Sequence, residues 1–542
     1  MTLEKVGLIY MNNAKSGLFL SLSLALAFII TVGLSYAYFS ARIVGKESAS
    51  TITLSAGVME INYSEGNGII ELLGIYPKDD AWATKTFTVT GKNSTDLKMN
   101  YKMGIEIEEN TFSSGSLTYS LENIVNDGGN PVNNIDGPIV LVNGTQLLGY
   151  GSFNKGMDIK HTYTIKIYFK NNGKDQNENQ KARFKGKIVL GEINDDTLLA
   201  AILSNRPIAT RETIPGRQVA TSNEGLRATK DDYGTTYYYR GAIGNNYVSF
   251  ADMCWRIVRV TGDGSIKLVL SNYMKRDARL AINEANADNP CASVYNGNTN
   301  AFARYDDTTN GKNGISVYNT AHNKNTYAGF MISNTPNAST YDGTHANDKP
   351  NTALSNLMKW YNLYIKDYEE KLADVIWCND ISVGSFGNGI GSNPTRYAAD
   401  GRLDTNPTLV CPDASGTNKK LSKFTAKDTN YGNGALTINE NTYMIGLLTA
   451  DEVAYAGGHR STSNESFYLY TNAHDRWWTM TPYGYVNTEG THVRVYPVIN
   501  YIATDSYIYN AHGLRPAIAL KSDITIKDNG ATGTAAKPYI IN

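Results

Sequence analysis

Apolar and polar residues alternate along the first part of the chain. The clearest run is 99–108, where every second residue is apolar, and similar runs occur at 162–170 and 184–190. Shorter apolar runs lie at 52–54, 59–63, 87–89 and 117–121. A period of two residues is typical of a strand with one buried face. Because turn-rich spacers separate the runs, the pattern predicts an antiparallel β-sandwich over residues 42–192.

A second folded unit is expected over residues 226–542. Short strands are predicted at 237–240, 247–250, 255–260 and 266–270, with glycine-rich turns at 244–246 and 262–264, which is the start of a β-meander. Apolar residues at spacings of three and four predict a helix over 351–376. A short helix should begin at Thr449, which forms a capping-box pattern with Glu452, and Gly457 stands where a C-terminal glycine belongs. This unit is predicted to be α+β.

The stretch 193–225 separates the two units. It has no lasting periodicity and contains Pro207, Pro215 and Gly216. These features indicate a linker that lets the distal domain move. The length of 542 residues also favours at least two cores, because one core rarely supports a chain of this size.

Residues 16–41 contain no charged residue and follow Lys5 and Lys15. The run is long enough to span a bilayer, and it also fits a secretory signal. The sequence Ser35-Tyr36-Ala37 obeys the small-x-small rule, so cleavage would separate Ala37 from Tyr38. Residues 1–41 are therefore either a cleaved signal peptide or an uncleaved transmembrane anchor. Both alternatives predict export.

The charges of the chain are nearly balanced. It has 50 basic and 51 acidic residues and a net charge of -1. No basic block is present, so nucleic-acid binding is not expected.

All four cysteines lie in the second unit. An even number in an exported chain predicts two disulfides, for which three pairings exist. We favour Cys254 with Cys291 and Cys378 with Cys411, because each pair closes a moderate loop rich in Asn and Gly. There is no C-x-x-C motif, and no histidine lies at ligand spacing from a cysteine, which argues against zinc.

Several other motifs resemble phosphate-binding or calcium-binding sites. The glycine-rich run 387–391 follows no predicted strand and opens no helix, so it is not expected to bind phosphate. Asp306 and Asp307 with Asn310, or Asp428 with Asn430, could hold calcium, but neither group has the full EF-hand pattern. Polar residues of this kind are common in loops that face the solvent, and this explains both groups better than calcium binding does. No other cofactor is expected.

Two histidine pairs, His459-Arg460 and His474-Asp475, could suggest acid-base chemistry. No serine or cysteine nucleophile stands at a known spacing from them. The sequence therefore identifies no catalytic residue.

The segments AYFSARIVGKESASTITLSAGVMEINYSEG (37–66) and HTYTIKIYFKNNGKDQNENQKARFKGKIVL (161–190) resemble the camelysin and TasA-like surface proteins of Gram-positive bacteria. The resemblance covers about residues 20–192. It implies a jelly-roll-like sandwich, removal of the leader by a dedicated peptidase and, in some members, fibres built by donation of an N-terminal strand. Here that arm would be 42–54. The chain departs from the family in its long leader and in Ala41, where an acidic residue is usual. It has no HExxH motif, so no protease activity is expected.

The segments YYYRG, CWRIV, HDRWWTMTPYGY, HGLRPAIALKSDITI and GTAAKPYIIN resemble an uncharacterised family of Firmicutes surface domains. That family is distantly similar to the C-type-lectin and formylglycine-generating-enzyme fold. The resemblance implies a C-type-lectin-like second unit with Trp255, Trp477, Trp478 and Arg515 as fold-defining residues. The family's Trp-Trp-Leu-Arg stretch is Trp-Trp-Thr-Met here. The paired catalytic cysteines of the enzyme do not map onto this chain.

Three classes of function remain. The first is a surface protein whose lectin-like domain binds a glycan or a protein during adhesion. The second is a self-associating subunit of a matrix or pilus-like fibre, and the third is an extracellular enzyme. Any ligand site is expected in the long loops 299–348 and 483–510, because such folds vary their loops and keep their scaffold.

Overall fold

The structure is a computed structural model of the 542-residue chain, and it describes residues 50–542 apart from short gaps. The gaps are 55–56, 64–67, 95–98, 114–115, 140–143, 172–175, 193–196, 205–217, 274–290, 292–300, 428–436, 439–440, 461, 471–475, 487–491, 499–500, 503–505 and 528–529. Strands make up 43% of the structure and helices 15%. The protein is therefore mainly β, as the sequence predicts.

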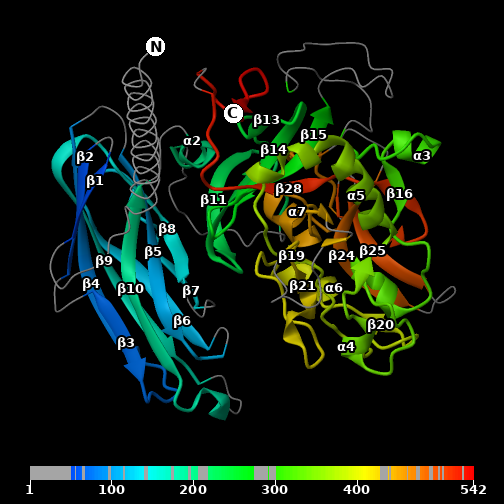
Figure 1. Ribbon diagram of the computed structural model, residues 1–542, viewed down its shortest axis with the longest axis horizontal. Helices are drawn as coiled ribbons and strands as arrows, with labels where there is room; N and C mark the ends of the chain where they lie inside the picture. Colours follow the sequence, from blue (N-terminus) through cyan, green and yellow to red (C-terminus); the bar gives the residue numbers. More distant parts are fainter. Residues whose placement is uncertain are drawn as a thin grey trace, which may run out of the picture.

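The first unit consists of two antiparallel sheets, drawn in blue to teal in Figure 1. One has the order β1-β2-β4-β9-β6-β7 and the other the order β3-β10-β5-β8. The strands are β1 (Ser50–Leu54), β2 (Gly57–Tyr63), β3 (Ile69–Leu73), β4 (Ala83–Asn93), β5 (Met99–Asn110), β6 (Leu117–Asn126), β7 (Ile135–Pro138), β8 (Gly144–Phe153), β9 (Gly156–Phe169) and β10 (Arg183–Glu192), with a 3-10 turn η1 (Asn177–Asn179).

The core of the first unit lies between these sheets. The alternating runs of the sequence fall on β5, β9 and β10, and the shorter runs fall on β1, β2, β4 and β6. The inward residues Met103 and Ile105 of β5 meet Ile165 and Ile167 of β9 in one buried cluster. The predicted alternation is confirmed, because each strand buries one face against the opposite sheet.

The second unit has two larger sheets with helices around them (Figure 1). The first sheet has the order β11-β12-β14-β13-β29, with β15 beside β14 and β28 beside β15. Its strands are β11 (Asn223–Asp231), β12 (Gly234–Gly241), β13 (Tyr247–Phe250), β14 (Met253–Val260), β15 (Ile266–Tyr273), β28 (Ala517–Leu520) and β29 (Tyr539–Ile540). The four predicted strands are present, but only β13, β14 and β15 form a meander, because β12 pairs with β14 and not with β13.

The other large sheet has the order β16-β27-β24-β25-β26, with β20 beside β24. Its strands are β16 (Ile315–Val317), β20 (Thr395–Arg396), β24 (Trp477–Val486), β25 (His492–Val498), β26 (Ser506–Tyr507) and β27 (Ala511–Gly513). Small ribbons pair β17 (Met331–Ile332) with β18 (Lys349–Pro350), β19 (Trp377–Cys378) with β21 (Lys423–Phe424), and β22 (Thr437–Ile438) with β23 (Asn441–Thr442).

The helical segments of this unit are short. They are α3 (Thr309–Lys312), α4 (Tyr341–Thr344), α5 (Thr352–Tyr364), α6 (Ala399–Thr405) and α7 (Ala450–Ala456), with 3-10 segments η2 (Asn325–Ala328), η3 (Lys366–Lys371) and η4 (Lys419–Ser422). The prediction for α7 is confirmed in detail: Thr449 and Glu452 form the capping box, and Gly457 has the left-handed φ of 116°.

The predicted helix over 351–376 is wrong in its second half. It begins as expected, with the Asn351 side chain accepting from the Leu354 amide. It ends at Tyr364, because the following chain turns back to pair with β28: Leu372 bridges Leu520, and the Ala373 amide donates to Ala519. Residues 366–371 form the 3-10 segment η3, and pairing with the sheet overrides the helical spacing from Leu372 onward.

Part of the stretch 193–225 is helical. Helix α2 (Leu198–Ser204) buries Leu198 and Ile202 in the core of the second unit, and the Leu198 amide donates to Ile524. A linker was expected here, but residues 197–204 belong to the second unit. They dock there because their apolar side chains complete its core.

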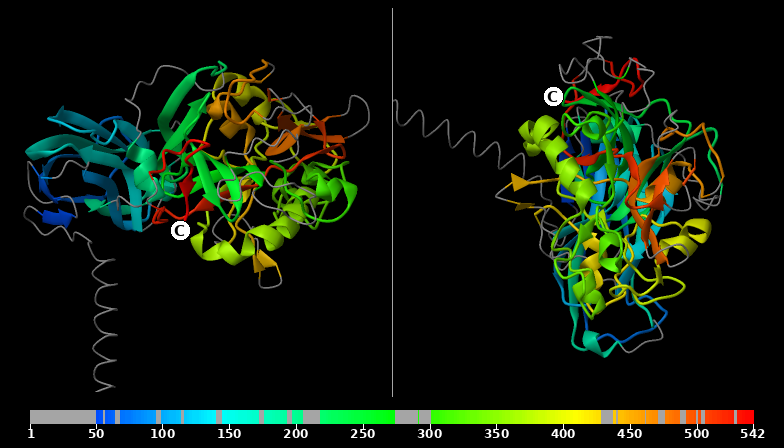
Figure 2. Two further views of the ribbon diagram at one scale, coloured as in Figure 1. Left: turned by 90° about the horizontal axis from the view of Figure 1, so that it is seen from above. Right: turned by 90° about the vertical axis from the view of Figure 1, so that its right-hand side faces the viewer.

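The two units lie side by side and touch (Figure 2). Tyr150 of β8 packs on Tyr237 of β12 with ring centroids 5.7 Å apart. The Thr235 hydroxyl donates to the Leu148 carbonyl, and Lys230 pairs with Asp136 at 3.1 Å. Tyr150 is buried in the same apolar cluster as the core of the second unit. These contacts argue against the free movement expected of the linker.

Residues 16–41, with the cleavage position between Ala37 and Tyr38, lie outside the described residues. Within the part of the chain that the structure describes, no helix is long and apolar enough to cross a membrane.

Candidate functional site

The four residues expected to define the second fold are all buried. Trp255, Trp477, Trp478 and Arg515 are each at most 2% exposed. The Arg515 guanidinium donates to the Leu270 and Leu469 carbonyls at 2.9 and 2.7 Å and lies over the Trp477 ring. These side chains hold strands together and present no surface to a ligand.

Two disulfides join Cys254 to Cys291 and Cys378 to Cys411, with Cα separations of 5.1 and 5.5 Å. This is the pairing that the loop lengths favour. The second bond encloses residues 379–410, which pass beside β24. Disulfides are compatible with an extracellular location.

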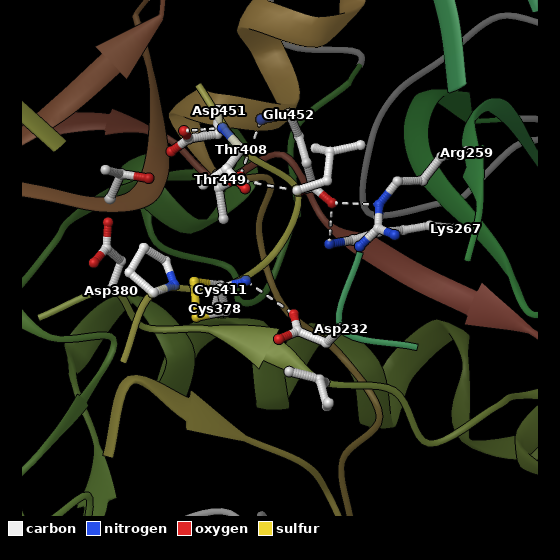
Figure 3. A pocket seen from close by; sticks show the side chains of 14 residues that line it. Asp232, Arg259, Lys267, Cys378, Asp380, Thr408, Cys411, Thr449, Asp451 and Glu452 are labelled. Atoms are coloured by element: carbon white, nitrogen blue, oxygen red, sulfur yellow. Dashed lines mark hydrogen bonds and ion pairs between the residues drawn. A yellow bond between two sulfur atoms is a disulfide. The ribbon is translucent and has the colours of Figure 1, made fainter. Parts of the chain in front are cut away.

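A small polar cavity lies next to the Cys378–Cys411 disulfide (Figure 3). It is lined by the disulfide, by Asp232 and Asp380, and by residues at the start of α7, among them Thr449 and Glu452. Its volume is about 20 Å³. A space of this size holds about one water molecule. It cannot admit a substrate.

A buried network of charges forms one wall of this cavity (Figure 3). Glu452 Oε1 accepts from Lys267 at 2.7 Å and from Arg259 at 3.0 Å. Arg259 also pairs with Asp231 at 2.5 Å. The two cations thus meet two anions, and the Lys267 ammonium lies 4.5 Å above the Trp377 ring. A paired network of this kind joins β14, β15 and α7.

Burial and pairing shift the pKa values of the network in opposite directions. Burial lowers the pKa of Lys267 to about 8, although Glu452 acts against this shift. Burial alone would raise the pKa of Glu452, but Lys267 and Arg259 bring it to about 2. Burial raises the pKa of Asp231 to about 6 in spite of Arg259. Such perturbed groups mark candidate sites, but here no room for a reactant adjoins them.

A second network includes Asp380 and Asp451, which also line the cavity. Arg402 of α6 donates to both oxygens of Asp451, at 3.0 and 2.9 Å, and also to Asp380. The Asp451 carboxylate accepts from the Thr408 amide as well. Both networks are therefore saturated by the protein's own groups, and we assign them to the stability of the fold.

The other motifs do not assemble sites among the described residues. The Asp306 carboxylate accepts from the Thr308 amide, and Thr308 in turn caps α3. No group of three or more metal-binding side chains occurs in the described residues. The Asp428 and Asn430 pair and the His474-Asp475 pair lie outside it. The glycines at 387–391 form a tight turn whose Gly389 carbonyl faces His345 Nε2 at 3.0 Å.

The Arg460 of the other histidine pair binds acidic residues of α6. Its guanidinium lies 2.8 Å from Asp400 and 2.7 Å from Asp404. His459 donates no side-chain hydrogen bond from Nδ1 to a described residue. No nucleophile accompanies this pair.

The two long loops expected to carry a ligand site do meet. The Tyr485 hydroxyl donates to the Asn323 carbonyl at 3.0 Å, and the Tyr318 amide donates to the Ile508 carbonyl at 2.8 Å. Three rings gather at this junction. The Tyr507 and Tyr509 rings are stacked with centroids 5.2 Å apart, and the His322 ring lies 5.0 Å from Tyr509.

We call His322, Tyr507 and Tyr509 the loop aromatic cluster. Tyr509 is 40% exposed, which is unusual for a large ring in this unit. An exposed ring held by neighbouring rings is pre-organised for contact with a ligand. Sequence reasoning indicated the two loops, but it could not select these residues, because the stacking depends on the pairing of β26 with β25.

Comparisons with known proteins add little. Neither a protein-family model nor a curated protein sequence matches the chain. Among solved structures, a ruminal GH26 endo-beta-1,4-mannanase is similar over 27% of this chain and 28% of that chain, at 14% identity and a TM-score of 0.12. The chain thus matches little more than a quarter of that protein, and a likeness this weak carries no argument about fold or function.

Proposed function

We propose that the chain is an exported protein of a bacterial cell surface and that its second unit recognises a ligand during adhesion. In this proposal the first unit is a jelly-roll-like sandwich of the camelysin and TasA type, and the second has a C-type-lectin-like arrangement. Support for export comes from the apolar run 16–41 and from the two disulfides.

The observation that carries the proposal is the loop aromatic cluster. Two loops that are far apart in sequence converge there and expose Tyr509 beside Tyr507. The only other sizeable polar feature discussed above, the cavity beside α7, is too small for a ligand. Aromatic side chains that keep a polar hydroxyl suit recognition of glycans and proteins alike.

The test is a binding screen of the full chain on broad panels of glycans and surface proteins. Replacing Tyr509 by Ala should weaken the binding that is found by about tenfold, the effect typical of an aromatic contact residue. Tyr76→Ala is a matched control, because Tyr76 is 63% exposed on the first unit. Blank panels, or equal losses in both variants, would refute the proposal.

A second candidate function is a fibre subunit assembled by strand donation. One observation favours it: among the described residues β1 pairs with β2 alone and is an edge strand of its sheet. Donation would require β1 to leave this hairpin and pair with a neighbouring molecule. The full chain should then form polymers that disappear when residues 38–53 are deleted. Electron microscopy that finds monomers in both cases rules this function out.

A further inference from the structure

The turn of the β11–β12 hairpin is held by the two ends of the Cys378–Cys411 disulfide. The Asp232 carboxylate, in that turn, accepts from the Cys411 amide at 3.0 Å. Its other oxygen lies 2.9 Å from the Lys423 ammonium. Lys423 in turn lies opposite Cys378 in the ribbon of β19 and β21. One carboxylate therefore fastens the hairpin to both sides of the bond.

The same hairpin also carries contacts between the two units. Lys230 of β11 pairs with Asp136 of the first unit at 3.1 Å. Tyr237 of β12 packs on Tyr150 of the first unit, and the Thr235 hydroxyl donates to a carbonyl of β8. These residues lie on both sides of the turn. The first unit thus rests on the two strands of the hairpin, and the disulfide holds their turn.

The two disulfides differ in their exposure. Cys254 and Cys291 are 1% and 6% exposed, and Cys411 is 4% exposed. Cys378 is only half-buried. A thiol in solution therefore approaches the Cys378–Cys411 bond more easily than the other bond. Accessible disulfides are the ones that exchange readily with thiols.

The loop that the bond closes, residues 379–410, has contacts of its own. The Arg396 amide donates to the Phe386 carbonyl at 3.0 Å across a turn, and β20 pairs with β24. The Arg402 guanidinium binds the carboxylate of Asp451. These contacts remain when the disulfide is broken. We expect reduction to free Cys411 from β19 without unfolding the loop.

We propose that the Cys378–Cys411 disulfide is a redox switch that fixes the docking of the two units and that a dithiol opens it. One thiolate of the dithiol attacks the Cys378 sulfur, the S–S bond breaks, and Cys411 leaves as a thiolate that takes up a proton. The second thiolate of the dithiol then attacks the mixed disulfide and releases Cys378. The dithiol ends as a disulfide, and its two protons and two electrons reside on the two cysteines.

Reduction changes how the hairpin is held. Once Cys411 is free of Cys378, Asp232 no longer joins two chain segments that are fixed to each other. The turn can then shift, and the strands beside it move with respect to the first unit. This role of the disulfide requires no ligand of the second unit.

The test treats the folded full chain with dithiothreitol. Alkylation and mass spectrometry should find Cys378 and Cys411 labelled about tenfold faster than Cys254 and Cys291, because access controls thiol exchange. X-ray scattering should show the radius of gyration rising by about 2–4 Å in step with this labelling, since the units no longer pack as one compact body. Circular dichroism should stay unchanged, and reoxidation should restore the smaller radius.

Asp232→Ala tests the connection without a reductant. It removes the tie between the turn and the disulfide, so the radius of gyration of the oxidised protein should rise. Asp342→Ala is the matched control, because the Asp342 carboxylate also accepts from two backbone amides of the second unit, those of Thr417 and Asn418, at 3.0 and 3.1 Å. Its radius should equal that of the unmodified protein.

Four results would overturn the switch. They are an unchanged radius of gyration after full reduction, unfolding of the second unit on reduction, earlier reduction of the Cys254–Cys291 bond, and equal radii for the two aspartate variants. The first two would leave the Cys378–Cys411 bond as a structural crosslink only.

Discussion

Glu452 stabilises two different parts of the second unit. Glu452 closes the capping box of α7 through its Oε2 atom, which accepts from the Thr449 amide at 3.0 Å. Its Oε1 atom accepts from Lys267 and Arg259. One carboxylate therefore caps the start of a helix and neutralises two buried cations.

We expect Glu452→Gln to destabilise the protein by about 3–5 kcal/mol, because it leaves buried cations without their counter-charge. Chemical denaturation at pH 7 measures the change. Glu370→Gln is the control, since the Glu370 side chain is 66% exposed, and it should cost less than about 0.5 kcal/mol. Similar stabilities for the two variants would show that the network contributes little.

His345 should make the stability depend on pH. Burial lowers the pKa of His345 to about 4, from about 6.5 in an unfolded chain. Between these values the unfolded state binds a proton that the folded state does not, so stability falls as pH drops from 6.5 to 4. The contribution of one such residue is about 3 kcal/mol.

The His345→Gln variant tests this dependence. Its free energy of unfolding should fall less steeply than that of the unmodified protein between pH 6.5 and pH 4. His512 acts in the same direction, because burial lowers its pKa to about 4 as well, so a residual slope will remain. Parallel slopes in both proteins would contradict the assignment of a neutral, buried His345.

At the scale of elements, the sequence pattern predicted a strand or helix correctly where the residues of that element themselves carry the signal. The strands of the first unit and helix α7 follow from alternation and from a capping box. The second half of the helix predicted over 351–376 failed because Leu372 pairs with β28 instead. The turn that holds Arg396 was missed, because its position depends on β20 joining β24, and no local signal marks that pairing.

The Cys378–Cys411 disulfide closes the loop that contains this turn. The double variant Cys378→Ser, Cys411→Ser should lose about 2–5 kcal/mol of stability, the usual cost of removing a native disulfide. Denaturant unfolding of the variant and of the unmodified protein measures this effect. Unchanged stability would mean that the contacts of β20 alone hold the loop.

At the scale of the whole molecule, the two units form a shared contact through Tyr150 and Tyr237. The extent of this contact could not be predicted, because the sequence between the units contains prolines and glycine and no periodic pattern. Only the structure reveals that β8 lies against β12 and that α2 belongs to the second core.

Tyr150→Ala should uncouple the units. Tyr150 is buried, and truncation of a buried aromatic ring costs about 3–5 kcal/mol. We expect calorimetry to show one unfolding transition in the unmodified protein and two in the variant. Two transitions in both proteins would mean that the contact does not couple the units.

The last strands of the chain complete the sheet with which the second unit begins. β28 pairs with β15, and β29 pairs in parallel with β13, so residues 517–540 return to strands formed by residues 247–273. The first unit has no such dependence, because its sheets close by residue 192. During synthesis the first unit can fold as soon as it emerges. The second must wait, with its inner strands exposed, until about 270 further residues have been made. A cell that makes this protein therefore has to shield an unfinished sheet for about half of the time of translation.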